Sequence, residues 1–330
     1  MPETTQTTFR DAIVEALSEE MERDPAVIML GEDIGKAGGV FKQTQGLFDR
    51  FGKKRVIDTP ISEPGAFGMA VGAAMAGARP IFEVMFGDFI TLIMDQLVNQ
   101  AAKVSYMSAG KVSVPLVVRV TMGTGSNLGP QHSQSLYAWA CHVPGLKVLV
   151  PSTVEDAKTL YKAAIRDPNP VLIFEDRMLY GLKGHSPPPE AVAEIGKGRV
   201  IREGSDVTII AVGRMVQHAI KAAEELQRDN ISAEIIDPRS LVPFDAALAV
   251  GSVRKTNRAL VVDGGVRGFG AGAELAAILS EEAFDWLDAP VQRLCGANIP
   301  IPISKTLELL AQPSPATIAV AARGLVKDHL

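Results

Sequence analysis

Glu63 is the residue whose type and position most strongly suggest chemistry. An extended segment, residues 55–59, ends at Pro60, and the pattern predicts a helix that begins near Glu63 with Pro64 in its first turn. A carboxylate at a strand-to-helix junction lies where open α/β sheets bind their ligands. Taken alone, the same glutamate would more often be a cap that stabilises the positive end of the helix dipole.

His132 is the second candidate. It lies between two glutamines in residues 129–139, after the glycine-rich segment 122–129. A histidine on a loop after a buried strand is well placed for proton transfer, and a histidine hydrogen-bonded within its own loop is the alternative. The other histidines form no ligand cluster, and Cys141 and Cys295 fit no metal-ligand spacing, so we expect no zinc site.

A group of apolar residues, Met85, Phe86 and Phe89, lies at a strand end and at the start of the helix expected after it. Core packing is the default interpretation of such residues. An apolar and aromatic wall for a flat heterocycle is the alternative.

Other motifs argue against several enzyme classes. Gly268, Gly270 and Ala273 have the spacing of a dinucleotide-binding fingerprint, but they begin too far after Asp263, so we interpret them as a strand-to-helix loop. The chain contains no G-x-S-x-G, G-x-x-x-x-G-K-[ST] or H-E-x-x-H motif. The usual markers of acyl hydrolysis, nucleotide hydrolysis and zinc proteolysis are therefore missing.

Composition limits the partners and the compartment. The chain has 330 residues, 47% hydrophobic, with a net charge of −5 and no basic stripe, which argues against nucleic acid as a partner. We expect no membrane partner, because no apolar run is long enough to span a bilayer. The N-terminal residues have no apolar signal core. Two free cysteines suit a reducing compartment, so we expect a cytoplasmic protein.

Strand and helix patterns alternate along the chain, and the strands are continuous apolar runs, as in a parallel sheet covered on both faces. We expect strands at residues 26–33, 55–60, 79–86, 114–123, 146–152, 169–176, 206–213, 233–238, 258–265 and 291–296. We expect helices at residues 9–24, 63–77, 88–110, 153–167 (capped by Ser152 or Thr153), 215–228, 245–256, 272–286 and 315–326.

A break divides this alternation. Residues 181–198 hold three consecutive prolines and several glycines, which is typical of a linker. We therefore predict an α/β domain over residues 1–180, a linker over 181–198 and a smaller α/β domain over 199–330.

Taken together, the segments resemble the beta subunit of the thiamine-diphosphate-dependent first component of 2-oxo acid dehydrogenase complexes. The resemblance covers nearly the whole chain. It is carried by GEDIG (31–35), IDTPISEPGAFGMAVGAAMAG (57–77), MDQLVNQAAK (94–103), PQHSQS (130–135), PGLKVLVPST (144–153), AIRDPNPV (164–171) and DPRSLVPFD (237–245).

The resemblance implies a transketolase-type pyrimidine-binding domain followed by a transketolase C-terminal domain. It implies that Glu63 hydrogen-bonds the aminopyrimidine ring of thiamine diphosphate and promotes its activation, with Phe89 and Met85 against the ring. His132 would lie near the thiazolium, facing the substrate and the incoming lipoyl group. Leu92 falls at a cofactor-binding position where some relatives carry a polar residue.

The family holds the diphosphate through Mg²⁺ on a Gly-Asp-Gly motif, and this chain has none. The resemblance therefore implies that an alpha subunit holds Mg²⁺ and half of each site, in a heterotetramer of two alpha and two beta subunits. A potassium ion is implied at a site formed by Leu116, Ala164, Asp167 and Asn169.

The implied activity is that of an oxidoreductase that decarboxylates a small 2-oxo acid and passes the acyl group to a lipoyl disulfide on the acyltransferase core of the complex. Pyruvate, branched-chain 2-oxo acids such as 2-oxoisovalerate, and acetoin stay open as substrates. A self-contained transketolase-like enzyme and a non-catalytic assembly subunit are the alternatives. The missing metal motif argues against the first of these, and the presence of both Glu63 and His132 argues against the second.

Overall fold

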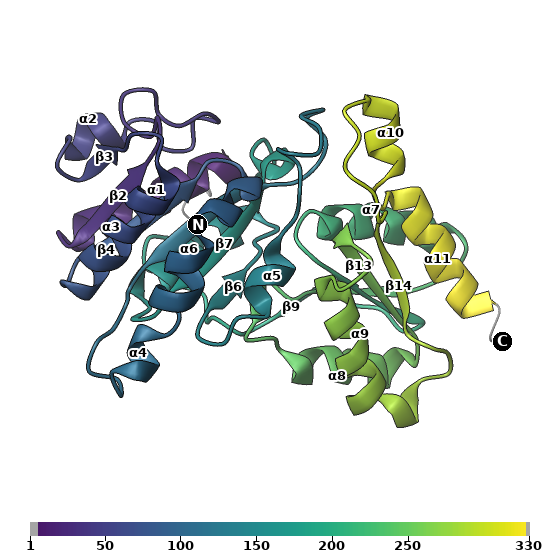
Figure 1. Ribbon diagram of the computed structural model, residues 1–330. Coiled ribbons are helices and arrows are strands. Elements are labelled where there is room, and N and C mark those ends of the chain that lie inside the picture. The colour runs from purple at the N-terminus through teal and green to yellow at the C-terminus, as the bar shows by residue number, and fades with distance from the viewer. Residues whose placement is uncertain (1–5, 328–330) are drawn as a thin grey trace. The chain divides into compact units, whose positions relative to one another are not determined.

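The computed structural model describes residues 6–327, which fold into two compact units (Figure 1). The first unit comprises the described residues up to Met122 together with residues 139–195. The second comprises residues 123–138 together with the described residues from Gly196 onward. The segment 123–138, which includes His132, is therefore part of the second unit.

The first unit contains a parallel sheet in which β6, β7, β5, β4, β2 and β3 are neighbours in that order. In chain order, its elements are β1(Gln6–Thr8), α1(Phe9–Arg23), β2(Val27–Gly31), α2(Leu47–Phe51), β3(Val56–Asp58), α3(Glu63–Met75), β4(Arg79–Val84), η1(Gly87–Ile93), η2(Gln96–Ala101), α4(Val104–Met107), β5(Val117–Met122), α5(Tyr137–Cys141), β6(Lys147–Leu149), α6(Val154–Arg166), β7(Val171–Asp176), η3(Arg177–Leu179) and β8(Lys183–His185).

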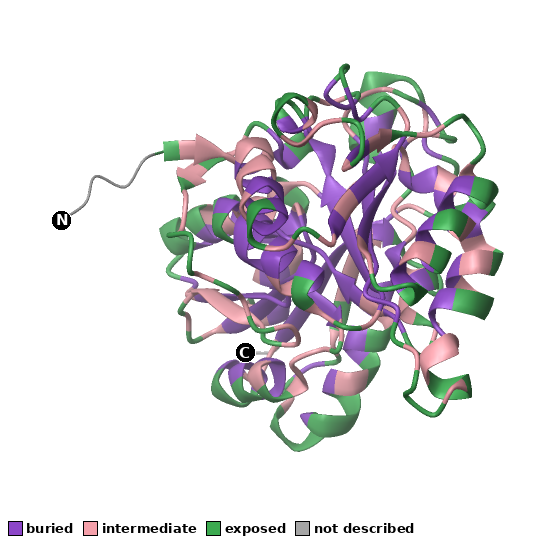
Figure 2. Ribbon diagram, turned by 90° about the vertical axis from the view of Figure 1, so that its left-hand side faces the viewer, coloured by how far each residue is buried: buried purple, intermediate pink, exposed green. Residues whose placement is uncertain are grey.

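Helices cover both faces of this sheet. The helices α1 and α6 pack together on one face, where strand residues such as Ile81 join their apolar core. Successive strand residues point to opposite faces, so Phe82 meets Phe67 of α3 on the other face, with ring centroids 5.1 Å apart. Figure 2 shows the resulting concentration of buried residues on the strands. The predicted α/β architecture is confirmed.

Local signals explain several boundaries. The side chain of Thr153 accepts a hydrogen bond from the Asp156 N–H at 3.1 Å, so Thr153 caps α6, one of the two residues predicted for that role. The helix α3 begins at Glu63, as predicted. Within the predicted linker, residues 183–185 form β8, which pairs with β1.

The prediction of one long helix over residues 88–110 is wrong. The structure divides this segment into the 3₁₀-helix η1, the π-helix η2 and the short helix α4. Apart from Asp88, the buried positions of η1 recur every three residues, at Gly87, Ile90 and Ile93. Those of η2, Leu97 and Ala101, are four residues apart. A spacing of three suits a 3₁₀-helix, in which residues i and i+3 are eclipsed.

The second unit has a sheet of order β14-β13-β10-β11-β9, parallel except for β9. The helices α7 and α11 pack together over its apolar core. Its elements from residue 196 onward are β9(Arg199–Arg202), β10(Val207–Ala211), α7(Met215–Arg228), β11(Ala233–Asp237), β12(Ser240–Val242), α8(Ala246–Thr256), β13(Ala259–Val266), α9(Ala271–Glu282), η4(Phe284–Trp286), β14(Gln292–Gly296), α10(Lys305–Leu310) and α11(Pro315–Lys327).

Candidate active site

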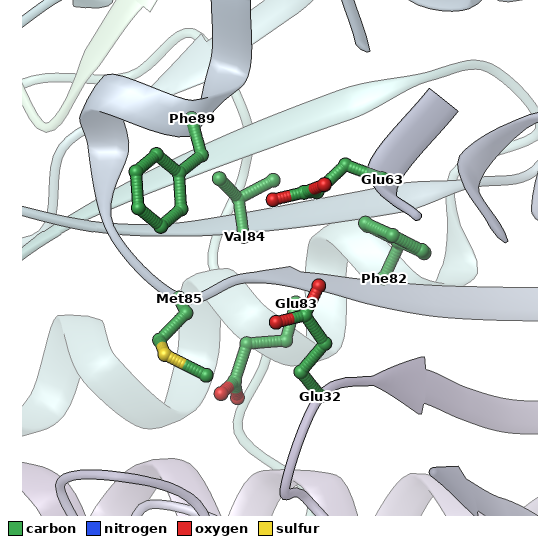
Figure 3. Close-up of a pocket in the computed structure, with 7 residues that line it drawn as sticks. All are labelled: Glu32, Glu63, Phe82, Glu83, Val84, Met85 and Phe89. Carbon is green, nitrogen blue, oxygen red and sulfur yellow. The ribbon is translucent and has the colours of Figure 1, made fainter. Parts of the chain in front are cut away.

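A recess lies at the carboxyl ends of the neighbouring parallel strands β2 and β4, where ligands bind in open α/β sheets (Figure 3). It contains about 270 Å³ of empty space, open solvent included. Its lining residues come from the β2–α2 loop, the start of α3, the end of β4 and η1. They are Glu32, Glu63, Phe82, Glu83, Val84, Met85 and Phe89.

Two carboxylates reach this recess from different elements (Figure 3). Glu63 is the first residue of α3 and is half-buried. Glu32 follows the last residue of β2, and its pKa is raised, first by burial and then by the negative charges of Glu63 and Asp33. Glu32 therefore keeps its proton to higher pH than an ordinary glutamate and can share it within the recess.

An apolar wall stands beside the carboxylates. Met85 and Phe89 both line the recess, and both are half-buried, so part of their apolar surface stays open. The Phe89 ring meets Phe86 edge-on at 5.8 Å, and Phe86 meets Phe41 in the same way at 5.8 Å. A carboxylate beside an open aromatic face suits a flat ring with a polar edge, which supports the heterocycle interpretation.

Another lining residue of the recess, Glu83, belongs to a buried ion cluster. Glu83 is 4% exposed, and its position between Phe82 and Val84 directs its side chain away from α3. Its Oε1 accepts a hydrogen bond from Gln43 Nε2 at 3.2 Å. Its Oε2 has an ion-pair contact with Arg119 Nη1 at 3.1 Å but no hydrogen bond of suitable geometry. Arg119 instead donates two hydrogen bonds to Glu175, at 3.1 and 2.9 Å. Burial raises the pKa of Glu83 to about 7, although the positive charge of Arg119 lowers it.

His132 lies in the other compact unit. Its N–H donates to the carbonyl of Gly129 at 3.4 Å, and the residue is half-buried. Two anchors hold the flanks of its segment. Arg214 donates to the carbonyl and hydroxyl oxygens of Thr124, both at 2.8 Å. On the other side, the Tyr137 hydroxyl donates to the buried carboxylate of Asp263.

The loop of residues 264–272, which the sequence indicated to be a strand-to-helix connection and not a dinucleotide site, takes part in this anchor. Asp263 is fully buried, and it accepts hydrogen bonds from the N–H groups of Gly265 at 2.8 Å and Gly272 at 2.9 Å. The Gly265 N–H also donates to the Tyr137 hydroxyl at 3.1 Å. Residues 264–272 thus wrap a carboxylate and hold Tyr137.

The structure brings Glu63, Met85 and Phe89 together and adds Glu32, which the sequence reasoning missed. Glu32 belongs to the quoted GEDIG motif, and the signal that could have identified it is its position directly after a buried strand. Leu92 lies in η1, 46% exposed and outside the residues that line the recess. Its predicted contact with the cofactor stays a prediction.

The residues of the predicted potassium site gather where α6 ends: Leu116, Ala164, Asp167 and Asn169. The carbonyls of Leu116 and Ala164 each accept one backbone hydrogen bond, which leaves acceptor capacity on both. Arg79 donates to the carbonyl of Asp167 at 3.3 Å, and Lys147 contacts the carboxylate of the same residue. Two side-chain cations thus already stand at this helix end, and the potassium ion stays a prediction.

Within residues 6–327, no group of three or more His, Cys, Asp and Glu side chains could hold a metal ion. No helix in the described part of the chain is long and apolar enough to cross a membrane. Within the described residues, neither Cys141 nor Cys295 forms a disulfide.

Two family profiles and one solved structure define the class of protein to which the chain is similar. Residues 5–183 match the family profile for the transketolase pyrimidine binding domain, and residues 196–318 match that for the transketolase C-terminal domain. The fold is similar to that of a split-gene transketolase described as an inactive beta4 tetramer, with a TM-score of 0.80 at 24% identity over 96% of this chain and 97% of that one.

Closer relatives define the family. The chain is 46% identical to pyruvate dehydrogenase E1 component subunit beta-2, mitochondrial, of Oryza sativa subsp. japonica, over 96% of this chain and 85% of that protein. It is 45% identical to pyruvate dehydrogenase E1 component subunit beta of Rickettsia felis, over 96% and 98%. The chain therefore belongs to the family of 2-oxo acid dehydrogenase E1 beta subunits, as the resemblance predicted.

Proposed function

We propose that this chain is the beta subunit of a pyruvate dehydrogenase-like enzyme. With thiamine diphosphate, the assembled enzyme decarboxylates a 2-oxo acid oxidatively and transfers the acyl group to a lipoyl disulfide. The observation that carries the proposal is the pair of Glu32 and Glu63 beside the open apolar face of Met85 and Phe89. The choice of pyruvate is supported by the names of the relatives.

The residues of the recess fit the pyrimidine end of this cofactor. Glu63 would hold a proton at a ring nitrogen, and Glu32, whose pKa is raised by burial and by the charge of Glu63, would help to keep a proton in the recess. Phe89 and Met85 would pack against the ring and exclude water from it. When bound, thiamine diphosphate supplies the electron sink that decarboxylation of a 2-oxo acid requires.

The recess would enclose only part of the cofactor. Its empty space is about 270 Å³ with open solvent counted, and the chain has no Gly-Asp-Gly motif to hold Mg²⁺ on the diphosphate. A second polypeptide would complete it, and the alpha subunit would also hold Mg²⁺ on the diphosphate. We accordingly propose a heterotetramer of two alpha and two beta subunits, bound to a lipoyl acyltransferase core.

The exposed face of α3 supports the proposal that a partner subunit binds next to the recess. Its exposed face carries Met69 (52% exposed), Gly72 and Met75 (46% exposed), with no charged residue in the helix after Glu63. A continuous apolar surface on a helix that begins at the site is typical of a protein contact. Cys141 and Cys295 form no disulfide in the described part of the chain, which suits a reducing compartment, and we place the enzyme in the cytoplasm.

Co-expression with a candidate alpha subunit tests this proposal. The purified assembly should reduce an added lipoyl domain with pyruvate, when both thiamine diphosphate and Mg²⁺ are present. The same assay with 2-oxoisovalerate and acetoin distinguishes the other members of the family. No turnover of any of these substrates by a folded, cofactor-loaded assembly would instead favour a non-catalytic subunit.

A further inference from the structure

The glycine-rich segment before His132 has an unusual backbone. Four of its residues have positive φ: Gly123 (101°), Gly125 (107°), Asn127 (56°) and Gly129 (75°). These left-handed conformations suit glycine and asparagine, and residues 123–129 contain no helix or strand to fix them. The position of such a loop depends on contacts from outside it.

Glu308 of α10 supplies such contacts. One carboxylate oxygen accepts from the N–H of Gly125 at 2.8 Å. The other accepts from the N–H of Asn127 at 3.2 Å and from its Nδ2 at 3.0 Å. Both oxygens of one carboxylate are thus used on two loop residues. All of these residues belong to the second compact unit.

The burial pattern of α10 is inverted. Glu308 is 1% exposed, whereas Leu307, Leu309 and Leu310 are 53%, 61% and 77% exposed. Among the residues that the structure describes, no Lys, Arg or His forms an ion pair with Glu308. A buried carboxylate without a cation is costly unless hydrogen bonds satisfy it. The hydrogen bonds from the loop offset that cost, and they explain why Glu308 is buried in α10.

We infer that Glu308 is a positioning residue for His132. It fixes residues 125–127, and together with the anchors at Thr124 and Tyr137 it leaves His132 on a short segment held at both ends. This inference rests on the proposed function, in which His132 serves acyl transfer to the lipoyl group. The conformational freedom of His132 would then be small, and effective catalysis requires such positioning.

A double-mutant cycle in the assembled enzyme tests this role. Alone, His132→Gln should lower the rate of lipoyl-domain acylation about a hundredfold or more, and Glu308→Gln about tenfold to a hundredfold, mainly in kcat. In the His132→Gln background, Glu308→Gln should add less than about threefold, because its effect passes through the histidine. Losses that multiply in the double mutant would overturn the inference.

Matched variants separate positioning from folding. Asn127→Gly keeps the positive φ but removes the Nδ2 donor, so it should give a smaller loss in the same direction as Glu308→Gln. Glu224→Gln changes an exposed carboxylate of the same unit and should leave kcat unchanged. If Glu308→Gln fails to assemble, Asn127→Gly replaces it in the cycle with the same criterion.

A readout without turnover keeps the inference distinct from the proposed function. In the assembly labelled at histidine, the NMR signal of His132 is identified by its loss in His132→Gln. Glu308→Gln should shift that signal and leave those of the other histidines in place. An unshifted His132 signal would overturn the inference, whereas an inactive wild-type assembly with a shifted signal would overturn only the proposed function.

Discussion

At the residue scale, the candidate site depends on two carboxylates that are distant in sequence. Glu63 could be predicted because a proline-flanked helix start is a local signal. Glu32 was missed, because it lies beside Glu63 only through the parallel pairing of β2 with β3, in which Gly31 is opposite Asp58. Which strands pair is decided by the folded sheet and cannot be predicted from a local sequence pattern.

Substitution of Glu63 tests its role directly. Glu63→Ala should lower the decarboxylation rate of the assembled enzyme about a hundredfold to ten-thousandfold at saturating cofactor. The melting temperature should change little, because a helix-terminal side chain contributes only on the order of 1 kcal/mol. Near-normal activity in this variant would remove Glu63 from the catalytic residues.

Glu83 should make the stability of the folded chain depend on pH. Burial raises its pKa from an ordinary 4.5 to about 7, so between these values the folded chain holds a proton that the unfolded chain has released. The free energy of unfolding contributed by Glu83 therefore falls as pH rises through this range, by about 3 kcal/mol at most. It is fully present below pH 4.5 and lost above about pH 7.

The glutamine of the variant Glu83→Gln cannot ionise, so the variant's free energy of unfolding lacks this pH-dependent contribution. Relative to wild type, it should gain stability as the pH is raised from 5 to 8, whatever its constant offset from altered contacts with Arg119. Urea denaturation of both proteins at several pH values measures the difference. Parallel stability curves for wild type and variant would contradict the raised pKa.

At the element scale, helices with a clear apolar stripe were predictable, as α6 and α7 illustrate, and α6 also has a capping residue. The segment 88–110 was not, because three-residue and four-residue spacings succeed one another within it and only packing decides between helix types. The helix α10 was missed because it is short and its buried residue is the charged Glu308. Burial of that residue makes sense only with loop 123–129 in place.

The exposed face of α3 should be a subunit contact. A Cβ at Gly72 would meet no atom within 4 Å in this chain, so Gly72→Leu is tolerated by the fold itself. Inside a packed interface, the same side chain has no room, and we expect loss of the tetramer with little loss of helical structure. Gly251→Leu is the matched control, since it is also an exposed helical glycine with open space around it. Sedimentation velocity decides, and an intact tetramer for Gly72→Leu would count against this contact.

At the scale of the whole molecule, the sequence allowed prediction of two α/β units but not of the crossing of segment 123–138 into the second one. That segment follows β5 directly, and its anchors Arg214, Asp263 and Glu308 lie far along the chain. Glu63 belongs to the first unit and His132 to the second. The domain boundaries at residues 180 and 199 stay predictions.

We propose that this chain carries only half of a thiamine diphosphate site. Isothermal titration calorimetry of thiamine diphosphate with Mg²⁺ measures this most directly, on the purified chain alone and on its assembly with the alpha subunit. We predict weak or undetectable binding by the isolated chain and tight, Mg²⁺-dependent binding by the assembly. Tight, Mg²⁺-dependent binding by the isolated chain would contradict it.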